Sequence, residues 1–511
     1  MENISDQSWD VLVIGGGATG LGVAVDSVTR GYKTILLEKS DLAKGTSSRS
    51  TKLVHGGVRY LAQGDLFLVM EALAERGRLL KNAPHLTTNQ EFIIPVYRWF
   101  DVMLYTAGLT FYDILAGRLS LGKSYFINRV KTIERLPNLK PEGLKGGIVY
   151  HDGQFDDSRL AVALAETCVC NGGIVLNYFN VTGLLKNEKG KIEGVRTTDC
   201  ISGKEYELKS KVVINATGVF ADDILRIDNP SAHHIIRPSQ GVHLVLDSSF
   251  LQGNSAIMIP KTDDGRVLFA IPWYAKVVTG TTDTPLDMIS EEPVALDEEV
   301  NFILNTAKKY LVRAPEKKDI LSVFAGLRPL ASDPDNPQST KEISRRHKII
   351  LSKSNLLTIT GGKWTTYRCM AEETIEKAIK AGLLGKRKCV TKNFLLNSGG
   401  VIKKEERLKI YGKGAGEIED LIKLDPSLNT RISDKLPYTK AEILWICRNE
   451  MPVTLEDILS RRTRSLLLDA RESEKIAPEI ASIMAAELNY DNTWIKGQLE
   501  KFSILVRNYI R

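Results

Sequence analysis

Residues 45–61, GTSSRSTKLVHGGVRYL, combine hydroxyl, basic and imidazole side chains with a pair of adjacent glycines. Neither the period of an amphipathic helix nor the alternation of a strand runs through them. Hydroxyl groups and backbone amides hydrogen-bond anionic oxygens, and glycine lets the backbone lie directly against a ligand. We therefore expect this stretch to hold an extended polar ligand.

A second candidate site is the glycine cluster GGGATG at residues 15–20, which contains the GxGxxG spacing between an expected strand and an expected helix. Gly15 permits the tight turn, Gly17 lets a pyrophosphate approach the backbone, and Gly20 lets the helix pack on the strand. Glu38 ends the next expected strand, where a carboxylate accepts the two ribose hydroxyls of an adenosine. The pattern predicts a dinucleotide site, and the carboxylate argues against NADP.

Two later stretches have the same character. Residues 211–218, KVVINATG, form a buried strand that ends in a small-residue turn, and residues 356–368, LLTITGGKWTTYR, form a strand, a glycine turn and the start of a helix. Three widely separated junctions can converge on one long ligand, and this favours FAD over NAD.

The motifs GGGATG, TSSRSTKLVHGGVRYL, NATG, GTTD, GLRPL and GGKWTTYR occur in this order, and with them the chain resembles the FAD-dependent glycerol-3-phosphate dehydrogenase family. The resemblance covers roughly residues 8–380, and the helical C-terminal part also resembles that family's cap domain. It implies oxidation of sn-glycerol 3-phosphate to dihydroxyacetone phosphate, with electrons passed to quinone or, in an oxidase branch, to oxygen.

The resemblance also implies the fold. We expect an α/β protein with a Rossmann-like FAD-binding domain of the amino-acid-oxidase-like type, an antiparallel-sheet substrate domain and a helical C-terminal domain. Short strands alternating with turns in residues 234–284 agree with the antiparallel sheet, whereas aromatics and prolines interrupt any regular pattern in residues 90–150. The expected domains are an FAD-binding domain of 1–90, 151–232 and 326–385, a substrate-binding domain of 91–150 and 233–325, and a cap domain of 386–511.

The resemblance assigns the cofactor site residue by residue. Hydroxyls of the 46–48 run would hydrogen-bond the pyrophosphate and ribityl chain, His55 would pack on the flavin, and the glycine pair after it would let the backbone lie against the ring. The expected FAD-binding residues are Gly15, Gly17, Gly20, Glu38, Thr46, Ser47, Ser48, His55, Gly56, Gly57, Ala216, Gly218, Gly361, Gly362, Lys363 and Thr365.

Basic side chains suit the phosphate of the implied substrate. For Arg49 and Lys52, a solvated loop face and a role in the site both stay open. The expected substrate-binding residues are Arg59, Tyr60, Arg328, Lys363 and Thr365. Three residues are candidates for catalysis: His243, Arg328 and Arg345. Imidazole is the natural base for the C2 hydroxyl proton, and either arginine could instead stabilise a developing alkoxide. The residues themselves do not decide between these roles.

Composition limits the partners. The chain has 511 residues and a net charge of +7, a modest excess that suits anionic small molecules or an anionic membrane face. No basic block with interleaved aromatics occurs, so nucleic acid is not an expected partner. Six cysteines without CxxC or zinc spacing indicate reduced thiols, a reducing compartment and no metal centre. The polar N-terminus indicates no signal peptide, and no apolar run approaches the ~20 residues of a membrane span.

The electron acceptor is predicted from chain length. The oxidase branch is associated with an insertion and a longer chain, and residues 329–361 leave no room for it, so we expect a membrane quinone. The protein would then be cytoplasmic and bound peripherally to the inner face of the cell membrane, an anionic surface. We interpret residues 99–129 as the cover of the substrate domain in preference to an interfacial membrane surface.

Three alternatives stay open: an oxygen-using oxidase, an amine or amino-acid oxidase-like flavoenzyme, and a flavin-binding interaction protein without activity. A homodimer also stays open.

Overall fold

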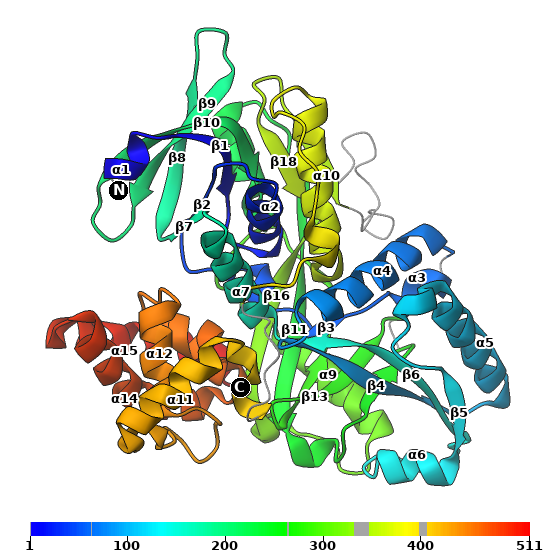
Figure 1. Ribbon diagram of the computed structural model, residues 1–511. Helices are drawn as coiled ribbons and strands as arrows, with labels where there is room; N and C mark the ends of the chain where they lie inside the picture. The colour runs from blue at the N-terminus through cyan, green and yellow to red at the C-terminus, as the bar shows by residue number, and fades with distance from the viewer. Residues whose placement is uncertain (1, 63, 263–264, 332–346, 398–405) are drawn as a thin grey trace.

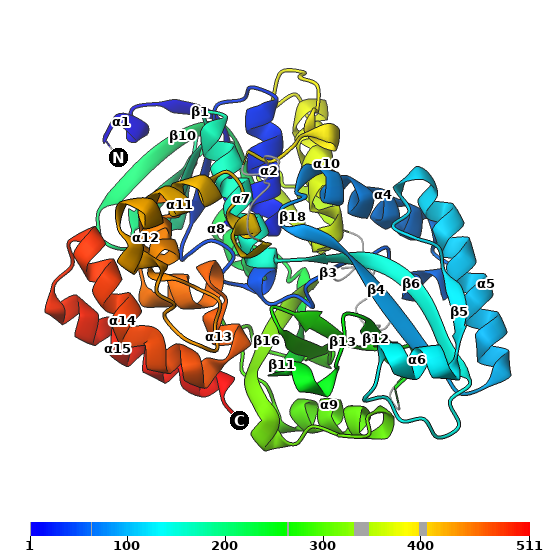
Figure 2. The same cartoon turned by 60° about the horizontal axis from the view of Figure 1, so that its bottom comes forward.

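Residues 2–62, 64–262, 265–331, 347–397 and 406–511 are described by the computed structural model, which shows two sheets and a group of C-terminal helices (Figure 1, Figure 2). The first sheet has the strand order β17-β18-β10-β1-β2-β7, with the hairpin of β8 and β9 joined to β10. Its strands are β1 (Ser8–Ile14), β2 (Thr34–Glu38), β7 (Ile174–Asn177), β8 (Phe179–Lys186), β9 (Ile192–Asp199), β10 (Glu205–Asn215), β17 (Lys348–Leu351) and β18 (Leu357–Thr360).

The centre of this sheet is parallel and covered on both faces. Val11, Leu12 and Val13 of β1 are fully buried, as expected for a central parallel strand. Helices α2, α7 and α10 pack on one face, and α8 with the β8–β9 hairpin packs on the other. These helices are α2 (Ala18–Thr29), α7 (Asp157–Cys170), α8 (Ala221–Asp228) and α10 (Tyr367–Lys380). The predicted strand–glycine turn–helix–strand unit is confirmed.

The second sheet has the order β15-β11-β14-β13-β12-β4-β6-β3, with β16 on β11 and β5 on β6. Its pairs are antiparallel apart from β12 with β4, and this confirms the antiparallel prediction. Helices α6 (Arg129–Arg135) and α9 (Asp297–Tyr310) lie along it (Figure 2). The strands are β3 (Leu53–Val54), β4 (Thr87–Val96), β5 (Tyr125–Asn128), β6 (Gly146–Phe155), β11 (Ile236–Asp247), β12 (Ala256–Ile259), β13 (Leu268–Trp273), β14 (Lys276–Gly280), β15 (Thr284–Pro285) and β16 (Ile320–Ala331).

The expectation of no regular pattern in residues 90–150 was wrong. This part contains β4, β6 and α5 (Trp99–Ala116), and α5 lies beside α4 (Leu66–Asn82), with the short α3 (Val58–Ala62) next to them (Figure 1, Figure 2). Helix α5 escaped notice because its exposed face is also apolar, so the polar face that marks an amphipathic helix is missing.

The C-terminal part is helical, as predicted. Its apolar cluster includes Val245, Trp273 and Phe324 of the second sheet, so these helices share a core with that sheet. The segment Asp457–Arg462 forms a π-helical turn that leads into α13. The helices are α11 (Gly414–Leu424), α12 (Lys440–Asn449), α13 (Ser465–Leu468), α14 (Ala470–Leu488) and α15 (Asn492–Val506). Over the described ranges, no helix has the length and apolar character needed to cross a membrane.

Candidate active site

A cavity of about 560 Å³ lies where residues of both sheets meet. Its walls come from the β1–α2 turn, the stretch between β2 and α3, the turn after β10, strands β11 and β16, and the turn after β18. The three junctions that the sequence singled out therefore line one continuous space, and one long ligand can contact all of them.

The glycines of the β1–α2 turn are required by close backbone contacts. Gly15 has φ +109°, and a Cβ there would lie 2.7 Å from the carbonyl oxygen of Ala216. A Cβ on Gly20 would collide with the carbonyl oxygen of Gly15. A side chain at Gly15 would displace the turn after β10, and one at Gly20 would separate helix α2 from its strand, so both are glycine for steric reasons.

The N-terminus of α2 can bind an anion. Its N-cap is Gly17, which supplies no side-chain cap, and the amide of Ala18 donates to Ser47 Oγ at 2.9 Å. The carboxylate of Glu38 accepts from the amides of Gly16 at 2.6 Å and Ser40 at 2.9 Å. Burial raises the pKa of Glu38 and the two amides oppose that shift. A positive helix end beside a cavity-lining carboxylate fits the pyrophosphate and ribose of FAD.

The other two junctions meet near His55. The amide of His55 donates to Thr365 Oγ1 at 3.2 Å and so ties the stretch before α3 to the turn after β18. Gly57, Gly361 and Gly362 have φ of +78°, +77° and +75°. These left-handed conformations leave backbone without side chains along the cavity, which fits a flat ring system.

The three hydroxyls of residues 46–48 have different positions. Ser47 lies at the start of α2, whereas Thr46 Oγ1 donates to the carbonyl of Leu327 at 2.6 Å and so joins the loop to β16. Ser48 is buried, and its hydroxyl points to the carbonyl of Gly45 at 3.4 Å. Of the residues expected at the cofactor, Gly20, Ser48 and Gly56 lie behind the cavity wall, and the others line it.

His243 is buried in the wall of the cavity, with 2% of its surface exposed. Its ring stacks on Phe324, with centroids 4.9 Å apart, and Nε2 lies 2.9 Å from Thr51 Oγ1. Burial, aided by the charges of Arg328 and Lys52, lowers the pKa of His243 to about 3. The imidazole is therefore neutral at physiological pH and can accept a proton.

Arg328 extends from β16 across Gly241, where any side chain would collide with the guanidinium. The guanidinium donates to Asp283 Oδ1 at 3.1 Å, to Thr281 Oγ1 at 3.0 Å and to the carbonyl of Thr282 at 2.9 Å. These contacts fix a planar donor fork at the cavity wall, beside His243.

Lys363 supplies a second positive charge at the cavity wall, next to the ring of Tyr60. The ammonium of Lys363 lies 3.8 Å from the centroid of the Tyr60 ring.

Two predicted site residues cannot be placed: Arg345 lies outside the described residues, and the side chain of Arg59, on α3, is also not described. Sequence reasoning missed Thr51 and Asp283, although Asp283 stands in the GTTD motif that carried the resemblance.

Arg49 and Lys52 do not lie on a solvated loop face, one of the two interpretations that the sequence allowed. Arg49 pairs with Glu292 at 2.6 Å, and the fully buried ammonium of Lys52 lies 2.6 Å from Asp157. Burial, together with the charge of Arg464, lowers the pKa of Lys52 to about 7. Arg49 also lines the cavity, whereas Lys52 lies behind its wall.

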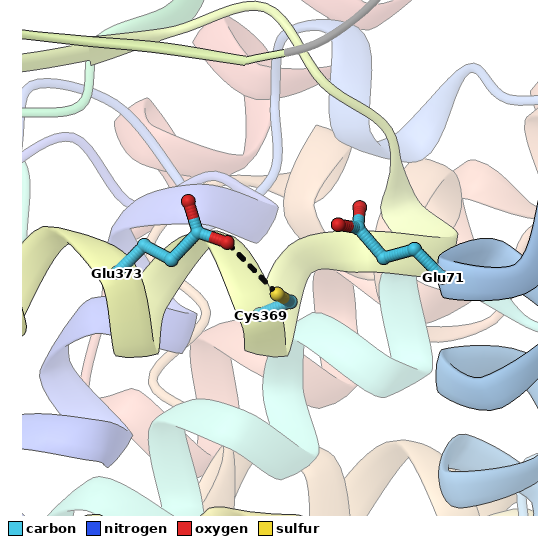
Figure 3. Close-up of side chains that lie close together, drawn as sticks. All are labelled: Glu71, Cys369 and Glu373. Carbon is cyan, nitrogen blue, oxygen red and sulfur yellow. Dashed lines mark hydrogen bonds between the residues drawn. The ribbon is translucent and has the colours of Figure 1, made fainter. Parts of the chain in front are cut away.

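One group of potential metal ligands lies outside the cavity. Glu71, Cys369 and Glu373 gather between α4 and α10, and the Cys369 thiol donates to Glu373 at 3.2 Å (Figure 3). Burial and the surrounding carboxylates raise the pKa of Cys369, and this disfavours the thiolate that metal binding needs. We assign no metal site to this group.

Two family models match the chain. The model described as FAD dependent oxidoreductase matches residues 10–368, and the model described as C-terminal domain of alpha-glycerophosphate oxidase matches residues 359–494. The first match covers more than half of the chain, which therefore belongs to the FAD-dependent oxidoreductases.

Individual relatives identify a narrower family within the FAD-dependent oxidoreductases. The mitochondrial glycerol-3-phosphate dehydrogenase of Bos taurus is 38% identical over 98% of this chain and 73% of its own, and that of Schizosaccharomyces pombe is 38% identical over 100% and 88%. The X-ray structure of glycerol-3-phosphate dehydrogenase from Bacillus halodurans complexed with FAD superposes with a TM-score of 0.79 at 28% identity, over 100% of this chain and 96% of that one. The chain belongs to the FAD-dependent glycerol-3-phosphate dehydrogenase family, and the predictions of family, fold class and cofactor are confirmed.

The structure of L-alpha-glycerophosphate oxidase from Mycoplasma pneumoniae has the same fold, with a TM-score of 0.58 at 18% identity, over 76% of this chain and 98% of that one. The quinone acceptor expected from chain length stays a prediction.

Proposed function

We propose that this chain oxidises sn-glycerol 3-phosphate to dihydroxyacetone phosphate and passes the electrons to a membrane quinone. When bound, FAD supplies the acceptor for the hydride that leaves C2 of the substrate. The observation that carries the proposal is that the glycine turn at Gly15, the neutral imidazole of His243 and the guanidinium of Arg328 line one cavity.

The β1–α2 region would hold the dinucleotide. The amides at the start of α2, with Ser47, would bind the pyrophosphate, and Glu38 would exchange its backbone contacts for the adenosine ribose hydroxyls. The side-chain-free backbone at Gly57 and Gly361 would lie against the flavin ring.

Arg328 and Lys363 would bind the substrate phosphate, which carries about −1.5 to −2 charges near neutral pH. The guanidinium fork of Arg328 is already held in place by Asp283 and Thr282, so little ordering is needed when the phosphate binds. Tyr60, with 7% of its surface exposed, would close the same side of the cavity. By resemblance, Arg59 and Thr365 complete this substrate site.

His243 would take the proton of the C2 hydroxyl. Its pKa of about 3 keeps the imidazole unprotonated, so that a ring nitrogen would accept the proton. By resemblance, Arg345 would stabilise the negative charge that grows on the substrate oxygen as the proton leaves.

An apolar face on α4 and α5 supports a membrane-bound acceptor. The two helices lie side by side at one end of the molecule (Figure 1, Figure 2). Only one face of α5 packs inward, through Leu109, Tyr112 and Ala116, so the helix covers the substrate domain and also exposes apolar side chains. The exposed apolar residues of the two helices are Leu66, Phe67, Met70, Trp99, Phe100, Met103, Leu104, Phe111 and Ile114.

Exposed basic residues flank α5 along the chain. Arg98, Arg118, Lys123 and Arg129 are all exposed. An apolar face bordered by cations is the arrangement of an interfacial membrane surface, since each basic group gains about 1 kcal/mol near anionic headgroups. A quinone in the bilayer would then be within reach of a protein that rests on that bilayer.

The visible spectrum of the purified holoenzyme tests the reaction. Anaerobic addition of sn-glycerol 3-phosphate should bleach the yellow colour, and a quinone analogue should restore it much faster than oxygen does. Bleaching without a preference for quinone, with stoichiometric hydrogen peroxide, would reassign the chain as an oxidase. No bleaching at all would contradict the substrate.

Vesicle binding tests the membrane surface. Holoenzyme should sediment with anionic phospholipid vesicles at low salt, and Phe100→Ser with Ile114→Ser should reduce the bound fraction at least several-fold. Ile504→Ser is the matched control, because Ile504 is similarly exposed but lies on α15. Equal binding by the double variant and the control would place the membrane contact elsewhere.

A further inference from the structure

Thr51 is the side chain that holds the ring of His243. Its Oγ1 lies 2.9 Å from Nε2, while Nδ1 is shielded from solvent without a hydrogen-bond partner among the described residues. Stacking on Phe324 fixes the plane of the ring but leaves it free to turn within that plane. The orientation of Nε2 therefore depends on where Thr51 stands.

The two neighbours of Thr51 are bound to one buried carboxylate. Asp157, the first residue of α7, accepts from the amide of Ser50 at 3.1 Å and from its hydroxyl at 2.6 Å, and it pairs with the ammonium of Lys52 at 2.6 Å. Both Asp157 and Lys52 are fully buried. Ion pairs at such depth are rigid, because a partner left alone would be a buried charge without compensation.

The C-terminal helices contribute the third group of this cluster. Arg464, just before α13, donates to Asp157 Oδ1 at 2.8 Å and to the carbonyl of Ser48 at 3.0 Å. Its side chain is fully buried. Arg464 therefore contacts the 48–52 loop both directly and through Asp157.

We propose that Thr51 is a positioning residue for His243, and that Asp157 and Arg464 hold Thr51 in place, so that the C-terminal helices complete the active site. The inference rests on the proposed function in one respect, the use of the His243 imidazole as the proton acceptor. It assigns to the C-terminal helices a part in catalysis although Arg464 does not reach the cavity wall.

The first experiment removes the Thr51 hydroxyl at nearly constant volume. In Thr51→Val holoenzyme, the rate of anaerobic flavin bleaching at saturating sn-glycerol 3-phosphate should fall roughly 10- to 100-fold, because a base misplaced by about 1 Å costs on that order. KM should change by less than about threefold, since the phosphate contacts are untouched. Thr51→Ser, which keeps the hydroxyl, should bleach within about threefold of the wild-type rate.

The second experiment tests the link to the C-terminal helices. Arg464→Lys keeps the charge but cannot reach Asp157 and Ser48 together, and its bleaching rate should fall about three- to tenfold. Arg461→Lys is the matched control: Arg461 is another buried arginine of the same segment, but it pairs with Asp41, Glu456 and Asp457. The control should lower the thermal midpoint and leave the bleaching rate unchanged.

The outcomes separate this inference from the proposed function. If wild-type holoenzyme does not bleach with sn-glycerol 3-phosphate, the proposed function fails. If the wild type bleaches and Thr51→Val does so at the same rate, the positioning role of Thr51 is overturned. If Arg464→Lys and Arg461→Lys lower the rate equally, the C-terminal helices support the fold only, and their assigned part in catalysis is overturned.

Discussion

The two ends of the cavity are built in different ways. The dinucleotide end consists of backbone: glycines of one short turn, the amides of a helix N-terminus and a carboxylate held by two amides. The substrate end consists of side chains from distant segments, such as Thr51 and His243, which are 192 positions apart and meet at 2.9 Å. The first end is a local property of the chain, and the second exists only after both sheets and the C-terminal helices have packed together.

The largest effect should come from a substitution that disrupts the dinucleotide end of the cavity. Gly20→Val places atoms against the carbonyl of Gly15, so helix α2 must move away from its strand. We expect purified protein without flavin absorbance. Gly497→Ala is the control, since a Cβ on that helical glycine meets nothing within 4 Å, and it should retain a full flavin content. A yellow Gly20→Val protein would contradict the dinucleotide placement.

A smaller loss of activity should follow when the proposed general base, His243, is removed from the substrate end of the cavity. His243→Gln should keep FAD but slow flavin bleaching at saturating substrate roughly 10²- to 10⁴-fold, the usual contribution of general base catalysis. Stopped-flow absorbance under anaerobic conditions measures this rate. An unchanged rate would show that His243 is only a packed residue of the sheet.

Removing a cation that binds the substrate phosphate should weaken substrate binding more than it slows flavin reduction. Arg328→Ala should raise KM roughly ten- to a hundredfold, because a charge-assisted hydrogen bond is worth about 1.5–3 kcal/mol. The flavin content should stay full. Arg196→Ala, which removes an exposed arginine paired with Glu207, is the control and should leave KM unchanged. If both variants have the wild-type KM, Arg328 does not bind the substrate.

The smallest predicted effect concerns pH and stability. His243 titrates near 6.5 when unfolded and at about 3 when folded, so between these values the unfolded state holds more protons. The free energy of unfolding therefore falls as pH falls below 6.5, by about 2 kcal/mol from this residue at pH 5. The thermal midpoint should drop more between pH 7.5 and pH 5 in wild type than in His243→Gln. Equal drops would mean that the folded imidazole titrates normally.

The contrast between the two ends also explains which sequence predictions succeeded. The glycine turn and the strands around it follow from spacing within about thirty residues, and the structure has the expected strand, turn, helix and second strand. Arg49 and Lys52 were ambiguous for the opposite reason. A loop sequence does not show whether a cation will meet Glu292 or Asp157, which stand more than a hundred positions away.

Helix α5 shows a second limit. Its apolar residues lie on the packed and the exposed face alike, so the helical period is hidden, and only the assembled molecule shows that Trp99 and Phe100 are 62% and 64% exposed.

By itself the sequence determined the dinucleotide turn, the family and the types of residue that the chemistry needs, because these depend on short spacings and on side-chain identity. Only the tertiary structure decided that His243 is buried and neutral, that Thr51 meets its ring, and that Arg464 reaches Asp157 from the C-terminal helices. The physical reason is that burial and pKa depend on every segment packed around a group, whereas a motif depends only on its own neighbours in the chain.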